Sequence, residues 1–531
     1  MYKRQILLAA ACTGDIGDGD DPTDPDGPIA TGTDVSVGPA FGRRLTREEV
    51  FNTIDVVLDV DLDPDAFDLP RDERVPGGFR NSAADQLLSL GRVEAYGEIA
   101  KAAVEAADWN ALLAEHASCT DATPDCYRGF VDSMGLLVMR RPVPETEAQM
   151  LVELFQLAAD EGDDFLAGAQ LVTRSMLQSP RFIYRLETQT PQGTDETRAV
   201  DAYELATRLS FLVWNAGPDT ALLDLAAQGD LPANIDAQLD RLYDSPRARR
   251  AMRQYVEQWL YLDAVPASFA LGDDLKEQTY RLFEWIAFDE SRDLMEAFSS
   301  QRAELTGELA EFYGLPSQGP DLAVYDLSEL PERVGFLTHA SVMAARTVNP
   351  DSSMIDRGLF VLNDIFCDGV PPPTDPELQE EIEAVKVPEG SGLSQRERFA
   401  IQSEHELCAS CHGKFDPLGL PFEVFGSAGQ HITEDQWGNP LSGQASVALY
   451  DIEGDFATVG EFVTALSQSE HVARCLAEKS MQHAYGRKLS AKDRDGIESA
   501  HALFVEAGGT YRALLNAVAH ADDFALVEVR P

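Results

Sequence analysis

Two cysteines and a histidine near residue 410 form the strongest chemical signature in the sequence. Cys408, Cys411 and His412 stand in the spacing Cys-x-x-Cys-His. Two thiols three residues apart on a helical turn can add to the two vinyl groups of a porphyrin, and the adjacent imidazole then lies under the ring as an iron ligand. The spacing therefore predicts one covalently attached haem c, with His412 as the proximal ligand.

Two other chemistries use the same residue types. His405, Cys408, Cys411 and His412 offer four ligands for zinc, but zinc sites normally place a longer spacer between their two ligand pairs. A thioredoxin-like dithiol is the second alternative, although the strand–helix context typical of that motif is missing here. Haem attachment is the favoured interpretation, and the other two stay open.

The sequence does not fix the sixth iron ligand. Met481, His431 and His483 are candidates because methionine and histidine are common axial side chains, and an open position is the remaining alternative. Five basic residues could neutralise haem propionates or form ordinary ion pairs: Lys414, Arg474, Lys479, Arg487 and Lys488. The sequence contains no nucleophile elbow, phosphate-binding loop, dinucleotide fingerprint or His-Glu-x-x-His motif, so catalytic residues are unknown.

Four further cysteines indicate an oxidising compartment. Cys119, Cys126, Cys367 and Cys475 form an even set, which in an exported protein predicts two disulfides. We expect Cys119 to pair with Cys126 across a short turn-rich run, and Cys367 to pair with Cys475. Four buried free thiols are the alternative.

The seventh cysteine predicts an anchor. Cys12 follows the short apolar run 6–11, so residues 1–12 resemble a truncated lipoprotein signal with a lipidated cysteine. We therefore expect an exported protein, periplasmic or on the cell surface, that meets a membrane only through this lipid.

The excess of acidic over basic residues disfavours some classes of binding partner. The chain has 91 acidic and 42 basic residues, a net charge of −49. Such a surface repels phosphate backbones and anionic membranes, so nucleic-acid binding is not expected. A redox partner protein or a substrate is the expected partner.

The periodicity of apolar residues predicts a mostly α protein of several helical units. Thr46 with Glu49 and Asp201 with Glu204 form capping boxes, and Ser245 precedes a first-turn proline. We divide the chain into the signal 1–12, an Asp/Gly/Pro tether 13–40, helical segments 41–118, 119–190 and 196–328, a cytochrome c-like haem segment 329–450, and a C-terminal helical segment 451–531.

Many short motifs, in one order, resemble the exported planctomycete-type cytochrome c proteins, which combine unknown-function segments with a Cys-x-x-Cys-His segment. The motifs are Leu45–Glu49 with Gly77–Phe79; Arg140–Pro142 with Ser179–Phe182 and Glu187; Leu205–Ser210 with Trp214 and Gln258–Leu260; Arg357–Gly358 with Cys408–His412 and Asp416–Gly419; and Ala484–Arg487. The resemblance implies haem c on Cys408, Cys411 and His412. Phe415 replaces a methionine common in the family, so this position offers no sulfur ligand.

Three functions are compatible with these observations. The favoured one is an exported monohaem protein that transfers single electrons. The first alternative is a haem-dependent oxidoreductase whose N-terminal helical region binds an organic substrate, such as a carbohydrate, because the region before the haem segment exceeds what an electron carrier needs. The second is a scaffold in which haem or zinc is structural.

Overall fold

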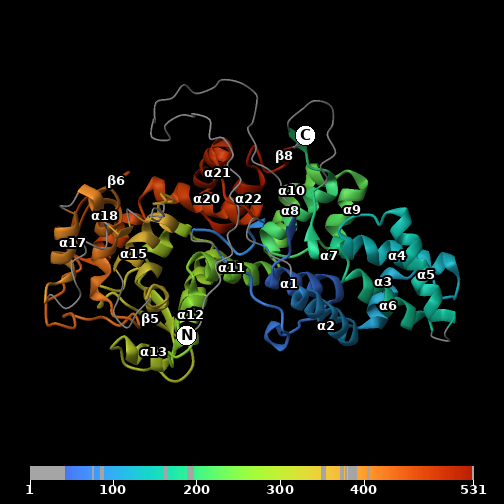
Figure 1. Ribbon diagram of the computed structural model, residues 1–531, viewed down its shortest axis with the longest axis horizontal. Coiled ribbons are helices and arrows are strands. Elements are labelled where there is room, and N and C mark those ends of the chain that lie inside the picture. The colour runs from blue at the N-terminus through green and yellow to red at the C-terminus, as the bar shows by residue number, and fades with distance from the viewer. Residues whose placement is uncertain are drawn as a thin grey trace. The chain divides into compact units, whose positions relative to one another are not determined.

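The computed structural model describes residues 42–528, except 75–76, 84–85, 87–88, 161–163, 188–196, 348–353, 371–375, 377–378, 381–391 and 404–405. The predicted mostly α fold is confirmed (Figure 1). Cys12 and the expected tether lie outside the described residues, as does His405. Within the described part, no helix is both long and apolar enough to cross a membrane.

The first helices begin where the sequence places caps. Thr46 and Glu49 complete a capping box before α1, which ends at Asp59 in the left-handed conformation. The helices of this part are α1 (Arg47–Leu58), α2 (Leu90–Ala106), α3 (Trp109–His116), α4 (Pro124–Met139), α5 (Glu145–Asp160), α6 (Phe165–Met176) and α7 (Pro180–Ile183), with the 3-10 helix η1 (Pro64–Ala66). Their apolar faces form one hydrophobic cluster, which Phe211 and Leu223 of the next segment join.

The middle of the chain is again helical. Asp201 and Glu204 form the second predicted capping box, and Ser245 caps α11 with Pro246 in its first turn. The elements are α8 (Ala202–Trp214), α9 (Thr220–Gln228), η3 (Leu231–Asn234), α10 (Ile235–Tyr243), α11 (Pro246–Trp259), η4 (Leu262–Ala264), α12 (Gly272–Glu284), the π-helix η5 (Trp285–Asp289), η6 (Leu294–Phe298) and α13 (Gly307–Phe312).

The part that contains the Cys-x-x-Cys-His motif has one group of helices, and a last group follows it. The former are η7 (Phe336–Thr338), α14 (Ala340–Ala344), α15 (Met354–Phe360), the π-helix η8 (Val361–Ile365), α17 (Gln395–Ser403), α18 (Glu406–Gly419) and η9 (Leu420–Val424). The latter are α19 (Val459–Leu466), α20 (Glu470–Tyr485), η10 (Ala491–Asp493), α21 (Arg494–Glu506) and α22 (Tyr511–Ala519).

The strands form antiparallel pairs; the first two pairs given below join distant parts of the chain, and the last is a hairpin of neighbouring strands. The pairs are β1 (Arg43–Arg44) with β2 (Tyr184–Arg185), β3 (Thr197–Ala199) with β8 (Leu526–Glu528), β4 (Arg302–Leu305) with β5 (Ala323–Asp326), and β6 (Ala445–Leu449) with β7 (Ile452–Phe456). In the first pair Arg43 lies opposite Arg185. In the second, Arg198 lies opposite Val527 and so ties the start of the middle segment to the end of the chain.

The largest hydrophobic core is shared by the last three parts of the chain. It includes Trp259 of α11, Phe415 of α18 and Met481 of α20. Because burial of apolar surface drives folding, these parts stabilise one another rather than each closing a core of its own. Helix α18 is thus held on a scaffold assembled from the middle and C-terminal segments.

Candidate haem-attachment site

Helix α18 carries both cysteines and the histidine of the motif. Residues three and four apart lie on one face of a helix, so the thiols of Cys408 and Cys411 point to the same side. They are the free cysteines among the described residues, Cys408 buried and Cys411 half-buried. Burial raises the pKa of the Cys408 thiol, with Cys411 and Asp416 contributing. Two adjacent free thiols on one helical face are what attachment to two vinyl groups requires.

The imidazole of His412 has a carboxylate partner one turn further along α18. Its Nδ1 lies 3.0 Å from each carboxylate oxygen of the buried Asp416. An ionised carboxylate only accepts hydrogen bonds, so this contact favours the tautomer with its proton on Nδ1, in which Nε2 is available as a ligand. Metal-binding histidines typically donate their second N–H to such a partner. The donor set therefore fits a haem iron on Nε2.

Two aromatic rings flank this imidazole. The ring centroid of Phe415 lies 4.7 Å from that of His412, and the centroid of Phe399 in α17 lies 6.2 Å from it. Both phenylalanines are buried. Apolar neighbours of this kind limit water at a redox centre, and the exposure of a haem is one of the properties that set its potential.

Helix α15 fixes the position of α18 through close backbone contact. A Cβ on Gly358 would stand 2.2 Å from the carbonyl oxygen of Phe415, and one on Gly419 would stand 2.1 Å from that of Met354. Neither distance leaves room for a methyl group. Glycine at these two positions therefore allows the two helices to touch.

Arg357, next to Gly358, anchors the chain that follows α18. Its fully buried guanidinium donates to the carbonyls of Phe422 and Phe425, both at 2.7 Å, and of Gly426 at 3.0 Å. Burial lowers the pKa of Arg357 to about 9. The carbonyl of Phe422 also accepts from the N–H of Phe425, and that of Gly426 from the N–H of Gly429, so the guanidinium adds a side-chain bond that links these backbone groups.

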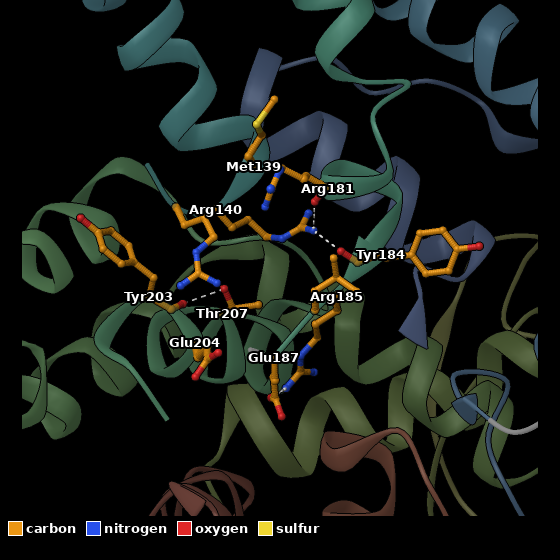
Figure 2. A pocket seen from close by; sticks show the side chains of 11 residues that line it. Met139, Arg140, Arg181, Tyr184, Arg185, Glu187, Tyr203, Glu204 and Thr207 are labelled. Carbon is orange, nitrogen blue, oxygen red and sulfur yellow. Dashed lines mark hydrogen bonds and ion pairs between the residues drawn. The ribbon is translucent and has the colours of Figure 1, made fainter. Parts of the chain in front are cut away.

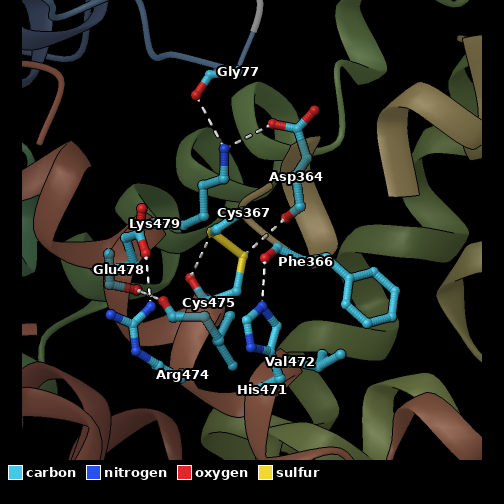
Figure 3. The surroundings of a disulfide bond; sticks show 12 residues. Gly77, Asp364, Phe366, Cys367, His471, Val472, Arg474, Cys475, Glu478 and Lys479 are labelled. Atoms are coloured by element: carbon cyan, nitrogen blue, oxygen red, sulfur yellow. Dashed lines mark hydrogen bonds and ion pairs between the residues drawn. A yellow bond between two sulfur atoms is a disulfide. The ribbon is translucent and has the colours of Figure 1, made fainter. Parts of the chain in front are cut away.

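Both predicted disulfides are present, Cys119–Cys126 and Cys367–Cys475. Figure 3 shows the second, which joins the end of η8 to α20. Beside it, Lys479 of α20 donates to Asp364 and to the carbonyl of Gly77, both at 3.0 Å. The disulfide and the buried ion pair together hold the residues before α18 against the C-terminal helices.

Most of the basic residues that could neutralise haem propionates form ion pairs with carboxylates of the chain. Lys479 pairs with Asp364, and Lys414 of α18 pairs with Asp368 at 3.3 Å. Arg474 pairs with Glu478 and Glu498, and Arg487 with Asp493. The ion-pair alternative therefore holds for these four residues.

The three candidates for the sixth ligand lie in three different surroundings. Met481 is fully buried in the large core. His483 is buried against Phe79 and Tyr255, and this burial lowers its pKa to about 4. His431 is partly exposed, with Nδ1 3.6 Å from a carboxylate oxygen of Glu332. The choice among them stays a prediction.

Asp416 is a candidate site residue to which the sequence analysis gave no role of its own. It was noticed only as part of an Asp-Pro-Leu-Gly motif. The spacing of the two residues could have indicated this contact. Side chains four residues apart lie next to each other on a helix, and His412 and Asp416 are four apart.

Five protein-family models match the chain, in sequence order. Each is described as a protein of unknown function: DUF1587 at residues 43–108, DUF1595 at 126–187, DUF1592 at 200–315, DUF1588 at 333–435 and DUF1585 at 454–524. This set of domains is typical of planctomycete cytochrome-c-like multidomain proteins. Each of the five motif groups that carried the resemblance falls within a different match, and the DUF1588 match contains all of α18. No curated protein and no solved structure matches the chain.

Proposed function

We propose that this cytochrome-c-like chain binds one haem c covalently and transfers single electrons outside the cytoplasm. The observation that carries the proposal is the arrangement on α18. Two free thiols lie on one helical face, next to an imidazole whose Nδ1 is held by a buried carboxylate. A bound haem c would supply one-electron redox chemistry at this position.

Each residue of α18 has a separate role in this proposal. Cys408 and Cys411 form the two thioether links, and His412 provides Nε2 as the proximal ligand. Asp416 keeps the imidazole in the required tautomer and makes Nε2 a stronger donor, because a carboxylate that accepts from Nδ1 increases electron density on the ring. Phe399 and Phe415 limit the contact of the imidazole with water.

Export is part of the proposal. Disulfides persist in oxidising compartments, and this chain has two. Covalent haem, disulfides and a lipid on Cys12 are compatible with one location, the periplasm or the cell surface. The partner is a redox protein, and the strongly acidic composition favours a partner with a basic docking face.

Absorbance spectroscopy after expression with a haem c maturation system tests the proposal. Acid–acetone extraction removes non-covalent haem, after which we expect a haem c spectrum in alkaline pyridine. The variant Cys408→Ala with Cys411→Ala should lose this signal, whereas Ser410→Ala, between the same two cysteines, should keep it. Zinc without haem in the matured protein would refute the proposal.

Redox titration separates electron transfer from the remaining alternatives. A reversible one-electron transition is the expected result. A covalent haem that cannot be reduced, and whose loss unfolds the chain, would favour a structural role instead. Reduction of the haem by an added organic substrate would favour an oxidoreductase.

A further inference from the structure

Four arginines line one cavity in a protein that is otherwise strongly acidic. The cavity has a volume of about 90 Å³ and lies between the end of α4, the α7–β2 turn and α8 (Figure 2). Its charged lining consists of Arg140, Arg141, Arg181, Arg185, Glu187 and Glu204. In a chain of net charge −49, four basic side chains around one small cavity create a local field of the opposite sign.

The two glutamates compensate these arginines only in part, because arginines outside the cavity form their hydrogen bonds. Arg208 donates two hydrogen bonds of 2.7 Å to Glu187, and Arg198 donates two, of 2.8 and 3.0 Å, to Glu204. Burial opposes the ionisation of Glu187, but the attraction of Arg208 still lowers its pKa to about 2. The charges within the Arg208–Glu187 pair and within the Arg198–Glu204 pair therefore largely cancel. The cavity arginines add positive charge to these pairs.

The four cavity arginines differ in their partners. Arg141 and Arg181, both partly exposed, form ion pairs of 2.5 Å with Asp201 and 2.6 Å with Glu147. Arg140 is buried and donates to the backbone carbonyls of the α7–β2 turn, so its role is to hold that turn.

Arg185 has the weakest partners of the four. It is buried, and it donates one long hydrogen bond of 3.4 Å to the carbonyl of Ala484. Its carboxylate neighbour Glu187 lies at 3.7 Å, beyond hydrogen-bonding distance. Figure 2 shows the guanidinium of Arg185 beside this carboxylate.

The strand pairing adds positive charge at the same place. Arg43 lies directly opposite Arg185 across the β1–β2 pair, and both guanidiniums lie 5.4 Å from the ring centroid of Phe211. Like charges in this position destabilise a strand pair. Glu49 neutralises Arg43, but Arg140 and Arg185 keep an excess of buried positive charge. Burial together with Arg43 lowers the pKa of Arg140 to about 10 and that of Arg185 to about 9.

We propose that this cavity is a binding site for a small oxyanion, either a carboxylate or a phosphate group. A buried guanidinium whose carboxylate neighbour lies at 3.7 Å and is shared with Arg208 is poorly compensated, and an entering oxyanion would add a second partner. The planar donors of arginine match carboxylate and phosphate oxygens, often in pairs of bonds. The cavity, with a volume of about 90 Å³, has room for such an anionic group.

The site joins two groups of motifs that the haem proposal leaves without a role. The first motif group, in the DUF1595 match, supplies Arg140, Arg141, Arg181 and Glu187. Thr207, which also lines the cavity, belongs to a motif of the DUF1592 match. The oxyanion site thus lies where two family segments meet, and it is independent of the haem proposal.

Calorimetric titration of the full chain tests the site. Sodium phosphate and sodium acetate are the two probes, each at constant ionic strength with sodium chloride as the control titrant. We expect saturable binding of at least one oxyanion beyond the chloride response. Phosphate alone would identify a phosphate site and acetate alone a carboxylate site. No saturable binding of either would overturn the proposal.

Matched variants assign the binding to this cavity. Arg141→Glu places a negative charge at the cavity, whereas Arg128→Glu makes the same change on the outer face of α4, where Arg128 pairs with Asp132 and Glu145. We expect Arg141→Glu to weaken oxyanion binding at least tenfold and Arg128→Glu to change it less than twofold. Arg185→Gln should also weaken it at least tenfold. Equal affinities for the two charge reversals in folded protein would refute the assignment.

Discussion

The two proposed sites of this chain are built in opposite ways. On α18, the residues that would hold haem lie within five positions of a single helix, Cys408 to His412. The oxyanion cavity takes its arginines from the end of α4, from α7 and from β2, and one wall from α8. The first site depends on helical spacing and the second on packing, so different substitutions should disturb them.

Buried arginines show the same contrast. Arg357, beside α18, donates short hydrogen bonds to three carbonyls at 2.7–3.0 Å. Arg185, in the cavity, donates one bond of 3.4 Å. A guanidinium with well-made bonds holds the fold together, whereas one with a weak bond beside a cavity is free to bind a ligand. Substitutions can test whether buried arginines with short hydrogen bonds and buried arginines with weak ones have these different roles.

The two disulfides should differ in their contribution to stability. Replacing Cys367 and Cys475 by serine should lower the free energy of unfolding by about 4–5 kcal/mol, because this bond closes a loop of 108 residues. The same change at Cys119 and Cys126, seven residues apart, should cost less than about 3 kcal/mol. Urea unfolding without reductant measures both, and equal losses would contradict the prediction.

Replacement of Arg357 by glutamine should cost more stability than the same replacement of Arg185. Arg357→Gln should lower the free energy of unfolding by about 3–5 kcal/mol, because the fully buried guanidinium and its three hydrogen bonds to carbonyls are lost. Arg185→Gln should cost about 1 kcal/mol or less, since it removes one long bond and a poorly compensated charge. Urea midpoints at an unchanged m-value provide the comparison. A larger loss for Arg185→Gln would show that Arg185 is a structural residue.

The contact between α15 and α18 should not tolerate a methyl group. Gly358→Ala should destabilise the protein by about 1–3 kcal/mol, because the new Cβ would collide with the carbonyl of Phe415. Gly91→Ala in α2 is the control, since nothing lies within 4 Å of a Cβ at that position. Its effect should stay within about 1 kcal/mol of zero. Thermal unfolding of the two variants shows whether the contact is as tight as the backbone indicates.

The smallest expected effect concerns the partner of His412, and it rests on the proposed haem. Asp416→Asn should raise the midpoint potential, because loss of a carboxylate next to the imidazole destabilises the more positive ferric state. We expect a shift on the order of 59 mV, which corresponds to a tenfold change for one electron.

A matched variant controls for the loss of charge alone. Asp368→Asn removes the same charge next to Lys414 of α18, without touching His412. It should shift the potential less than Asp416→Asn in a spectroelectrochemical titration. Equal shifts would mean that the hydrogen bond to His412 has no special role, even though the haem is attached.

The sequence by itself determined those features that depend on neighbours within about four residues. The caps at Thr46, Asp201 and Ser245 start helices where predicted, because a cap needs only backbone N–H groups two or three residues ahead. The spacing of Cys408, Cys411 and His412 places them on one helix for the same reason. The contact of His412 with Asp416 was readable from the spacing too, although it was missed.

Only the tertiary structure decided the features that join distant residues. No local sequence pattern indicates that Arg43 lies opposite Arg185 or that Gly358 contacts Phe415. None indicates the cavity lined by four arginines either. The sequence predicted that Cys367 pairs with Cys475, and the fold supplies the contact that brings them together across 108 residues. The physical reason is that helical geometry depends on local backbone bonds, whereas packing depends on which apolar faces meet in a shared core.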